Sequence, residues 1–216
     1  MFLSVAKIIL GILTAYLIGS LPTAYLLAKL YKRIDIRQHG SGNVGATNTF
    51  RVLGKLPGII VLAVDIVKGL ICPTLVADLF GQTSLLNRIV LAVAVVVGHN
   101  WTIFLKFKGG KGMATSLGVL IGLAIKISVL RLILLLSVGV WVISFLISGY
   151  VSLSSLIAAM GLPVLMVIFA APFELIAMGI IFCGFVVLRH RSNISRLVRG
   201  EESRVNFAFL KRKRFP

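Results

Sequence analysis

Long apolar stretches alternate with short polar connections along the whole of this 216-residue chain. A helix that crosses a bilayer needs about 20 apolar residues, and only helices or closed barrels pair every backbone group inside lipid. Barrel strands would alternate apolar and polar positions, which these continuous stretches do not. The pattern therefore predicts an all-α, polytopic transmembrane helical bundle of about seven spans. The predicted spans are residues 4–28, 57–79, 87–105, 112–127, 131–149, 152–171 and 173–190.

Composition favours a lipid environment for most of the chain. Hydrophobic residues make up 58% of it and the mean hydropathy is +1.04, which exceeds what a water-exposed globular surface tolerates. The connections are too short for a soluble domain, so residues 1–216 are expected to form a single integral membrane domain. Cys72 and Cys183 both lie inside apolar stretches and are expected to be packing residues.

Positive charge is concentrated in two of the connections and after the last span. The chain has 23 Lys and Arg against 6 Asp and Glu, a net charge of +17. In a soluble protein this excess would suggest a nucleic-acid partner, but the cytoplasmic loops of membrane proteins collect Lys and Arg. The distribution predicts cytoplasmic loops at about 32–56, 98–115 and 189–204, an N-terminus outside and a C-terminus in the cytoplasm. The basic, aromatic tail at 205–216 is expected to lie on anionic lipid.

The first of these loops carries a glycine-rich polar segment at residues 40–48. It has the form G-x-G-x-x-G, but a dinucleotide site needs a preceding strand and a βαβ unit, and this helical chain offers neither. Glycine still lets successive N–H groups converge on an anion, and the loop adds several side-chain donors. The candidate anion-binding residues are Ser41, Gly42, Asn43, Gly45, Thr47, Asn48 and Arg51. The alternative is a polar glycine turn between two helices.

The second loop, residues 98–115, again combines glycine with lysine. The segment Lys108-Gly109-Gly110-Lys111-Gly112 leads into the predicted helix at 112–127, so N–H groups, a positive helix end and two point charges would meet there. A Walker A motif is excluded, because the Gly-Lys pairs are not followed by Ser or Thr at the required spacing. These five residues are predicted to bind phosphate. His99, near the start of the loop, is either a packing residue or a general base.

The third loop, residues 189–204, combines arginines with His190, Asn193 and Glu202. His190 and Asn193 are three positions apart, so on a helix they share a face that Arg196 continues. Anchoring by positive charge would explain the arginines. It does not explain His190, Asn193 or Glu202, none of which is a standing cation.

Two charged residues, Asp65 and Lys68, lie inside the second predicted span. Each would cost about 2.5–3.5 kcal/mol if left unpaired at the bilayer centre. Their spacing places them on one helix face, which predicts a structural ion pair. Support of an active site is the alternative.

With these residues laid out, the three loops resemble the cytoplasmic motifs of the bacterial acyl-phosphate:glycerol-3-phosphate acyltransferase family. The resemblance covers nearly the whole chain. It rests on residues 40–48, on Gly98-His99 with residues 107–112, and on residues 190–193 with Arg196-Leu197, Gly200 and Glu202. One departure is Thr102, where the family commonly has proline, which leaves the bend after the third span open.

The resemblance implies a reaction and a location. A fatty acyl group would move from acyl phosphate to glycerol 3-phosphate, giving lysophosphatidate and inorganic phosphate in the first acylation of phospholipid synthesis. The enzyme would lie among the lipids of the bacterial inner membrane with its active site facing the cytoplasm. No cofactor, nucleic acid or obligate protein partner is expected, and no carboxylate or histidine cluster has metal-ligand spacing.

The resemblance also implies residue roles. The expected substrate-binding residues are Ser41, Gly42, Asn43, Gly45, Thr47, Asn48, Arg51, Lys108, Gly109, Gly110, Lys111, Gly112, Ser152, His190 and Asn193. Within this set Arg51, His190 and Asn193 would favour glycerol phosphate, and Ser152 would bind the donor phosphate. The expected catalytic residues are His190, Lys111, Ser41, Asn193 and His99, and the supporting residues are Asp65, Lys68, Arg196 and Glu202. The proton acceptor stays open between a histidine and a substrate phosphate.

Two other functions remain as alternatives. A transporter of an organic phosphate could use the same loops as an entry site, although transporters often show internal repeats and mid-membrane helix breaks, and no convincing repeat is visible here. A protein that only binds anionic lipid would explain the basic loops. It would leave Ser41-Gly42-Asn43 and His190 to Asn193 without a role.

Overall fold

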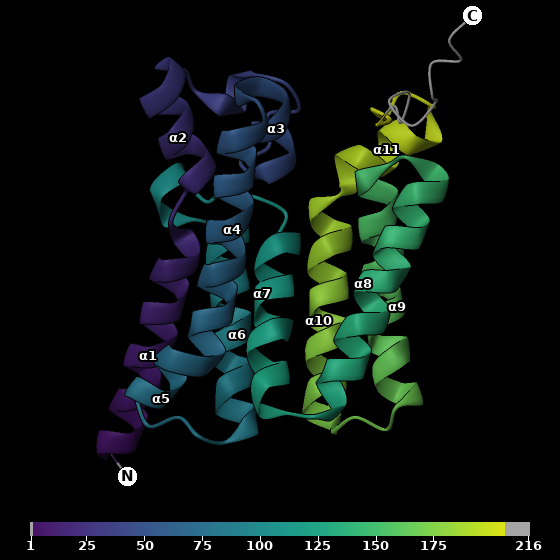
Figure 1. The fold of residues 1–216 in the computed structure, drawn as a ribbon. Helices are drawn as coiled ribbons and strands as arrows, with labels where there is room; N and C mark the ends of the chain where they lie inside the picture. Colours follow the sequence, from purple (N-terminus) through teal and green to yellow (C-terminus); the bar gives the residue numbers. More distant parts are fainter. Residues whose placement is uncertain (1, 206–216) are drawn as a thin grey trace, which may run out of the picture.

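The computed structural model describes residues 2–205, and every regular element among them is a helix (Figure 1). The helices are α1 (Phe2–Ser20), α2 (Thr23–Lys32), η1 (Ile36–Gln38), α3 (Ala46–Leu53), α4 (Lys55–Ile71), η2 (Cys72–Val76), α5 (Ala77–Leu79), α6 (Leu85–Asn100), η3 (Ile103–Leu105), α7 (Met113–Lys126), α8 (Val129–Ser148), α9 (Val151–Ile168), α10 (Phe173–Arg189) and α11 (Arg191–Val198). The predicted all-α class is confirmed. Residues 206–216, nearly all of the predicted basic tail, lie outside the described residues.

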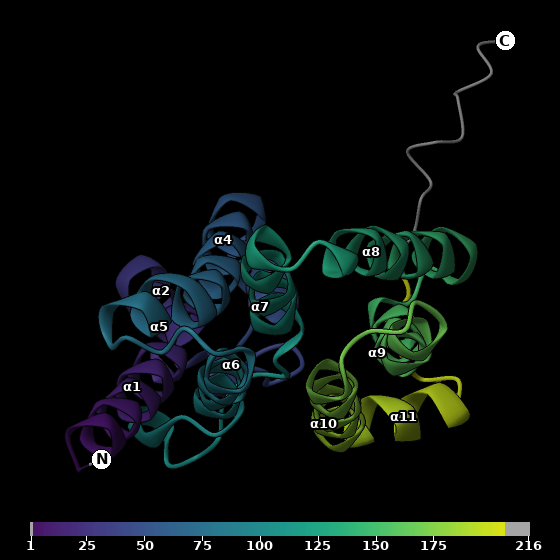
Figure 2. The same cartoon turned by 90° about the horizontal axis from the view of Figure 1, so that it is seen from below.

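The helices form two groups that stand side by side (Figure 2). The N-terminal group contains α1 to α7, and the C-terminal group contains α8 to α11. The chain crosses between them at the α7–α8 connection, at the end of the bundle where the N-terminus lies. α11 turns away from α10 by 61° and lies across the opposite end.

Helix boundaries follow local sequence. Ser84 begins α6 by accepting a hydrogen bond from the backbone N–H of Asn87, at 3.2 Å. Gly149 ends α8 in the left-handed conformation, at φ 74°, which glycine adopts without steric cost. Pro172 precedes the first residue of α10, where its missing N–H needs no partner.

Five segments of the described chain are long and apolar enough to cross a bilayer. They are Leu3–Lys32, Lys55–Leu79, Leu85–Leu105, Val129–Ser148 and Val151–Ile168, and the bent pair of α10 and α11 can make a sixth. α7 has 14 residues, about 21 Å of helix, which is shorter than the ~30 Å hydrocarbon core. Each of the seven predicted stretches is largely helical, although the third, 87–105, leaves the α-helix after Asn100. The number of spans and the side on which each terminus lies stay predictions.

The first predicted span differs from the structure, because its helix is broken at Leu21 and Pro22. The break leaves backbone carbonyls without helical partners. Thr102 donates its hydroxyl to the carbonyl of Ser20 at 2.5 Å, and the Lys68 ammonium lies 3.4 Å from the carbonyl of Leu21. Polar side chains from other helices thus stabilise a helix break that apolar periodicity alone does not reveal.

The predicted pair of Asp65 and Lys68 forms a buried ion pair on α4, with 2.8 Å between carboxylate and ammonium. Both side chains are at most 5% exposed. Lys68 also reaches the carbonyl of Leu21, which accepts from the N–H of Thr23, so the ion pair is connected to the helix break. The predicted ion pair is present, and its role as a structural pair or as support of an active site stays a prediction.

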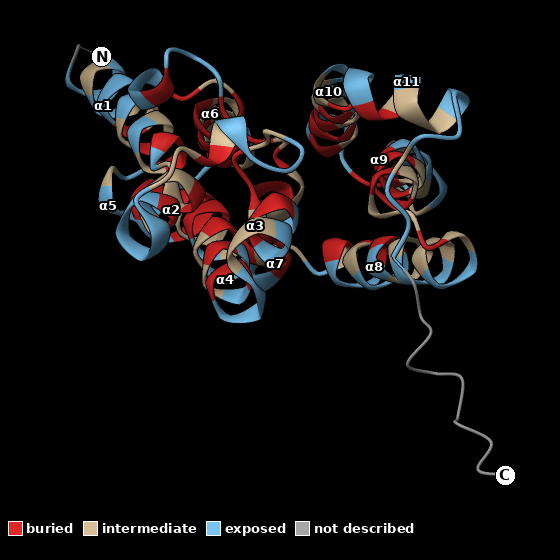
Figure 3. Cartoon of the chain, turned by 90° about the horizontal axis from the view of Figure 1, so that it is seen from above, coloured by how far each residue is buried: buried red, intermediate tan, exposed pale blue. Residues whose placement is uncertain are grey.

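The outer surface is apolar. Burial is concentrated inside each helix group and between them, and the exposed residues lie around the outside (Figure 3). On α8 the side chains of Leu135, Ile143 and Ile147 are 60–75% exposed. A protein in water would rarely leave so much contiguous apolar area uncovered, and lipid contact accounts for it.

Candidate active site

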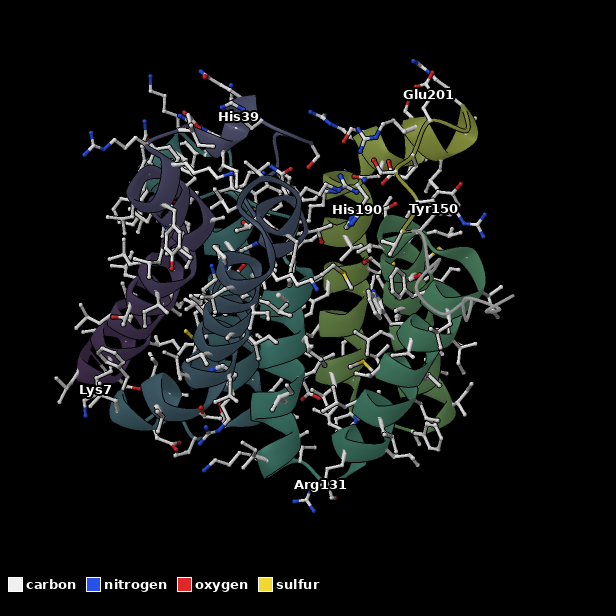
Figure 4. All side chains as sticks on the ribbon, turned by 45° about the horizontal axis from the view of Figure 1, so that its top comes forward. Lys7, His39, Arg131, Tyr150, His190 and Glu201 are labelled. Atoms are coloured by element: carbon white, nitrogen blue, oxygen red, sulfur yellow. The ribbon has the colours of Figure 1, made fainter. Side chains whose placement is uncertain are left out.

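A cavity of about 450 Å³ lies between the two helix groups. One end, here called the polar end, is lined by residues of all three predicted loops. The other, the apolar end, is lined by α7, α8, α9 and α10. The polar end lies toward the part of the molecule that carries His190, which Figure 4 shows opposite Lys7 and Arg131.

The predicted site residues divide into those that line the cavity and those that do not. The residues that line it are Ser41, Asn43, Gly45, Thr47, Asn48, Arg51, Asp65, His99, Lys111, Gly112, Ser152, His190, Asn193 and Glu202. The predicted residues that do not are Gly42, Lys68, Lys108, Gly109, Gly110 and Arg196. The structure thus brings together side chains from positions 41 to 202.

Asn48 organises the first loop. Its amide nitrogen donates to the carbonyls of His39, at 3.0 Å, and Ile36, at 3.4 Å, and its oxygen accepts from the N–H of Ser41 at 2.8 Å. The side chain is almost wholly buried. The amide N–H groups of Asn48 thus hold the loop in shape, and its predicted role in binding substrate stays a prediction.

The N-terminus of α3 supplies the anion-binding feature of this loop. Gly45 precedes the helix and no side chain caps it. Gly45, Ala46 and Thr47 line the cavity, so the first N–H groups of α3 lie at its polar end. A helix N-terminus without a capping side chain carries unpaired N–H groups and a partial positive charge, which together bind anions. Arg51, one turn further along, lines the same end.

The backbone N–H groups of Gly109 and Gly110 are already hydrogen-bonded within the protein. The N–H of Gly110 donates to the carbonyl of His99 at 2.9 Å, and that of Gly109 to the carbonyl of Asn100 at 3.2 Å. A Cβ on either glycine would lie 2.1 Å from an atom of His99. With these N–H groups paired, the glycines let the loop pack against the end of α6, and their direct role in binding phosphate stays a prediction. Lys108 is exposed and is not among the residues that line the cavity.

The second anion-binding feature is the N-terminus of α7 with Lys111 beside it. Gly112 precedes α7 in the left-handed conformation, at φ 80°, and no side chain caps the helix. Gly112, Met113 and Ala114 line the cavity. Burial lowers the pKa of Lys111 to about 8, and the positive charges of Arg196, Arg51 and Arg189 act in the same direction while Glu202 opposes them.

The third loop closes the polar end. The Lys111 ammonium donates to the carboxamide oxygen of Asn193, whose nitrogen donates to Glu202 at 2.7 Å. Ser152 and Arg196 also donate to the Glu202 carboxylate, at 2.8 and 2.7 Å. Burial would raise the pKa of Glu202, but these hydrogen bonds hold it below its usual value. Glu202 is therefore a charged acceptor that fixes Asn193 and Ser152 beside Lys111.

His190 lies just beyond the end of α10, and one of its two ring nitrogens is hydrogen-bonded to the backbone. Its Nδ1 is 2.8 Å from the carbonyl of Val186, which can only accept, so Nδ1 carries the proton and Nε2 is an acceptor. Burial, helped by the charge of Lys111, lowers the pKa of His190 to about 4. A neutral imidazole that lines the cavity can take a proton from a bound hydroxyl.

His99 lies on the other side, at the end of α6, with its Nδ1 3.5 Å from the Asp65 carboxylate. Its ring contacts Gly110, and it lines the same cavity. Asp65 orients this ring while it pairs with Lys68. The structure leaves two histidines within the cavity lining, each held by one partner.

Sequence reasoning missed Arg189 and much of the cavity lining, including its apolar side chains and Ser116, Ser137, Ser155 and Ser203. Arg189 donates to the carbonyls of Gly110 and Gly109, at 2.9 and 2.7 Å, although in the sequence it is indistinguishable from an anchoring charge. The apolar end is formed by Leu117, Leu120, Leu134, Val138, Trp141, Ala158, Leu162 and Phe182. In the sequence these residues are ordinary members of apolar spans.

The cavity is suited to an amphiphilic ligand that has an anionic head and an apolar chain, and its positive end offers two places for an anion. Two uncapped helix N-termini, Lys111 and Arg51 provide positive charge at one end, and apolar side chains provide a channel at the other. A phosphate ester with a long hydrocarbon chain would match both ends. The neutral imidazole of His190 and the ammonium of Lys111 lie where acid–base and charge-stabilising chemistry would be needed.

Comparisons with known proteins agree with this chemistry. The family model described as glycerol-3-phosphate acyltransferase matches residues 9–200. A glycerol-3-phosphate acyltransferase of Desulforamulus reducens is 41% identical over 194 residues, 90% of this chain and 93% of that protein, and glycerol-3-phosphate acyltransferase 2 of Moorella thermoacetica is 41% identical over 91% and 97%. The crystal structure of PlsY (YgiH), an integral membrane glycerol 3-phosphate acyltransferase, in its glycerol 3-phosphate form is 36% identical with a TM-score of 0.84, covering 95% of this chain and 99% of that one. Its lysophosphatidic acid form gives a TM-score of 0.81 over 93% and 96%.

Proposed function

This chain belongs to the glycerol-3-phosphate acyltransferase family, and we propose that it takes its acyl group from an acyl phosphate. It is an integral membrane enzyme that acylates glycerol 3-phosphate. The donor is the part of the reaction that rests on this chain's own residues and on the resemblance of its three loops.

One observation carries the choice of donor: a single cavity joins two positive helix N-termini to an apolar channel. Acyl phosphate and glycerol 3-phosphate each bring one phosphate, and the two N-termini provide one anion site each. The acyl chain would extend between α7, α8, α9 and α10. The described chain offers no soluble surface of the size that a carrier protein would need for docking.

The proposed reaction is a direct acyl transfer. A hydroxyl oxygen of glycerol 3-phosphate attacks the acyl carbonyl carbon, the bond from that carbon to the phosphate oxygen breaks, and inorganic phosphate leaves. Lys111, assisted by the N–H groups at the start of α7, stabilises the negative charge on the departing phosphate. Arg51 and the N-terminus of α3 hold the glycerol phosphate, and Ser41, Asn43 and Thr47 add donors.

The hydroxyl proton needs an acceptor, and His190 is the side chain best prepared for that role. Its Nε2 lone pair is free because Nδ1–H is committed to Val186. A phosphate oxygen of either substrate is the alternative acceptor. Because an acyl phosphate is already activated, no covalent acyl-enzyme intermediate is required.

We place the enzyme in the bacterial inner membrane with its polar end toward the cytoplasm. The basic loops support this orientation, since Lys and Arg accumulate on the cytoplasmic side. The second substrate, glycerol 3-phosphate, is a charged, water-soluble molecule, and it would reach the cavity from the side to which the three loops are exposed.

Phosphate release by the purified protein tests the proposal. The protein in lipid is given glycerol 3-phosphate with palmitoyl phosphate, or with palmitoyl-CoA as the alternative donor. We expect lysophosphatidate and inorganic phosphate with the first donor only, and a large loss of both with Lys111→Ala. Lys55→Ala removes an exposed lysine outside the cavity and serves as the matched control. Product from palmitoyl-CoA at a similar rate would contradict the proposed donor.

A further inference from the structure

Arg189, the last residue of α10, reaches from the C-terminal helix group to the second loop of the N-terminal group. Its Nε donates to the carbonyl of Gly110 at 2.9 Å and its Nη2 to the carbonyl of Gly109 at 2.7 Å. Its guanidinium also lies over the ring of Trp101, with 5.9 Å to the ring centroid. Arg189 is not among the residues that line the cavity.

These bonds complete the pairing of the two glycine residues. The N–H groups of Gly109 and Gly110 are already bonded to carbonyls at the end of α6, and Arg189 takes their two carbonyl groups. The N–H groups of this short segment are thereby held by the N-terminal helix group, and its carbonyl groups are held by the C-terminal helix group. The next residue is Lys111, whose ammonium meets Asn193 across the cavity.

An arginine is required by this geometry. Two successive carbonyl groups point the same way and receive two N–H groups of one rigid, planar fork. A lysine ammonium is a single point charge and would hold one carbonyl well. Trp101 contacts Phe185 of α10 edge to face, with 5.2 Å between centroids, and so keeps α6 and α10 at the separation that the fork spans.

We propose that Arg189 is a positioning residue for the acyl transfer: by holding the Gly109–Gly110 segment from the opposite helix group, it sets the position of Lys111 at the substrate phosphate. The proposal rests on the function proposed above for Lys111. It assigns to Arg189 an effect on the reaction that is exerted through Lys111 and through no contact of its own with substrate.

A double-mutant cycle tests this dependence. Phosphate release from palmitoyl phosphate is measured for the full chain in lipid, with Arg189→Gln, Arg189→Lys, Lys111→Gln and both combinations. Displacing a catalytic group by about 1 Å can cost ~10²-fold, so we expect Arg189→Gln to lower kcat/KM by about that factor and Arg189→Lys by less. In the Lys111→Gln background either change should cost no more than about threefold, because the effects of residues that act as a unit are not additive.

Controls separate positioning from stability and from the proposed function itself. Arg191→Gln removes a neighbouring exposed charge and should leave kcat/KM within about twofold, as surface substitutions usually do. Melting temperature is measured for each variant, and if Arg189→Gln does not fold, the cycle is decided with Arg189→Lys. Losses that multiply in the double variant, or full activity of Arg189→Gln, would overturn the inference. Full activity of Lys111→Gln would instead overturn the role proposed for Lys111.

Discussion

Lys111 and Asn193 are 82 positions apart in the chain, and the ammonium of the first donates to the carboxamide oxygen of the second across the polar end of the cavity. Lys111 belongs to the N-terminal helix group and Asn193 to the C-terminal one. The site therefore exists only when the two groups are packed together. Arg189 reinforces the same junction from the other side of the second loop.

The charge of Lys111 should set the alkaline limit of activity. Its pKa is lowered to about 8, so the ammonium is present below that pH and is lost as pH rises above it. We expect kcat/KM to fall about tenfold for each pH unit above that value. Arginine stays charged throughout this range, so Lys111→Arg should lack the alkaline fall even if its maximal rate is lower. A fall that survives unchanged in Lys111→Arg would assign it to another group.

Breaking the buried pair of Asp65 and Lys68 should destabilise the fold more than removing it. Asp65→Asn leaves the ammonium of Lys68 without its counter-charge in an apolar interior, which typically costs about 3–5 kcal/mol. Replacing both residues, with Asp65→Leu and Lys68→Met, should restore most of that loss. Thermal unfolding in detergent measures the difference. A double variant less stable than Asp65→Asn would show that the Lys68 contact with Leu21 matters more than the pair.

The sequence predicts the helices well because lipid imposes a simple requirement. Each stretch from 4–28 to 173–190 is largely helical in the structure, since a helix pairs the backbone groups of a continuous apolar stretch within lipid. The break at Leu21 was not predicted. It depends on Thr102 and Lys68, which supply hydrogen bonds from distant positions.

The polar end of the site was predicted by residue type, but the use made of each residue was predicted less well. Glycine and asparagine in the loops indicated phosphate binding. In the structure, however, the N–H groups of Gly109 and Gly110 and the side chain of Asn48 are hydrogen-bonded to nearby backbone groups. A sequence lists donors without saying which are already paired. Arg189 illustrates the opposite case, a side chain whose role the sequence did not indicate. Its carbonyl partner lies 79 positions away in the chain and is brought to it by tertiary packing alone.

His190 should affect the rate of the chemical step. If Nε2 accepts the hydroxyl proton, His190→Ala should lower kcat by ~10²–10⁴-fold, the range usual for a general base. His190→Gln is the control for side-chain volume. His99→Gln should have a smaller effect, because His99 is packed against Gly110 and Asp65. Near-normal kcat in both His190→Ala and His99→Gln would favour a substrate phosphate as the acceptor.

The pH dependence offers an independent test of His190. A pKa of about 4, lowered from 6.5, means that the imidazole is neutral and competent at all pH values well above 4. Titration of His190 should therefore cause no loss of kcat between about pH 5 and 8. An acidic fall centred near 6.5 that disappears in His190→Gln would contradict the buried, neutral state.

Labelling of introduced cysteines tests the orientation in the membrane. Thr83 and Arg199 are both exposed, Thr83 in the connection between α5 and α6 and Arg199 directly after α11. These two segments lie at opposite ends of the bundle (Figure 1). Thr83→Cys and Arg199→Cys are made in a chain whose Cys72 and Cys183 have been replaced by alanine. In sealed vesicles an impermeant maleimide should reach position 199 from the cytoplasmic side only and position 83 from the other side only. Labelling of both positions from one side would overturn the predicted topology.

The apolar end of the cavity should set a limit on acyl-chain length. Ala158 lines it and lies six residues beyond Ser152 on α9, about 9 Å along the helix from the polar end. A phenylalanine at this position would fill the channel there, so Ala158→Phe should lower kcat/KM for palmitoyl phosphate much more than for octanoyl phosphate. Val164→Phe adds a similar ring on the exposed face of the same helix and should change neither.

The ratio of the two donors decides this prediction, because a general loss of stability would lower both rates equally. A ratio that moves toward the shorter donor would place the chain in the channel between α7, α8, α9 and α10. An unchanged ratio would mean that the chain leaves the cavity before it reaches Ala158. In that case the hydrocarbon would extend between the helix groups into surrounding lipid, and the apolar lining would serve helix packing rather than selection of the donor.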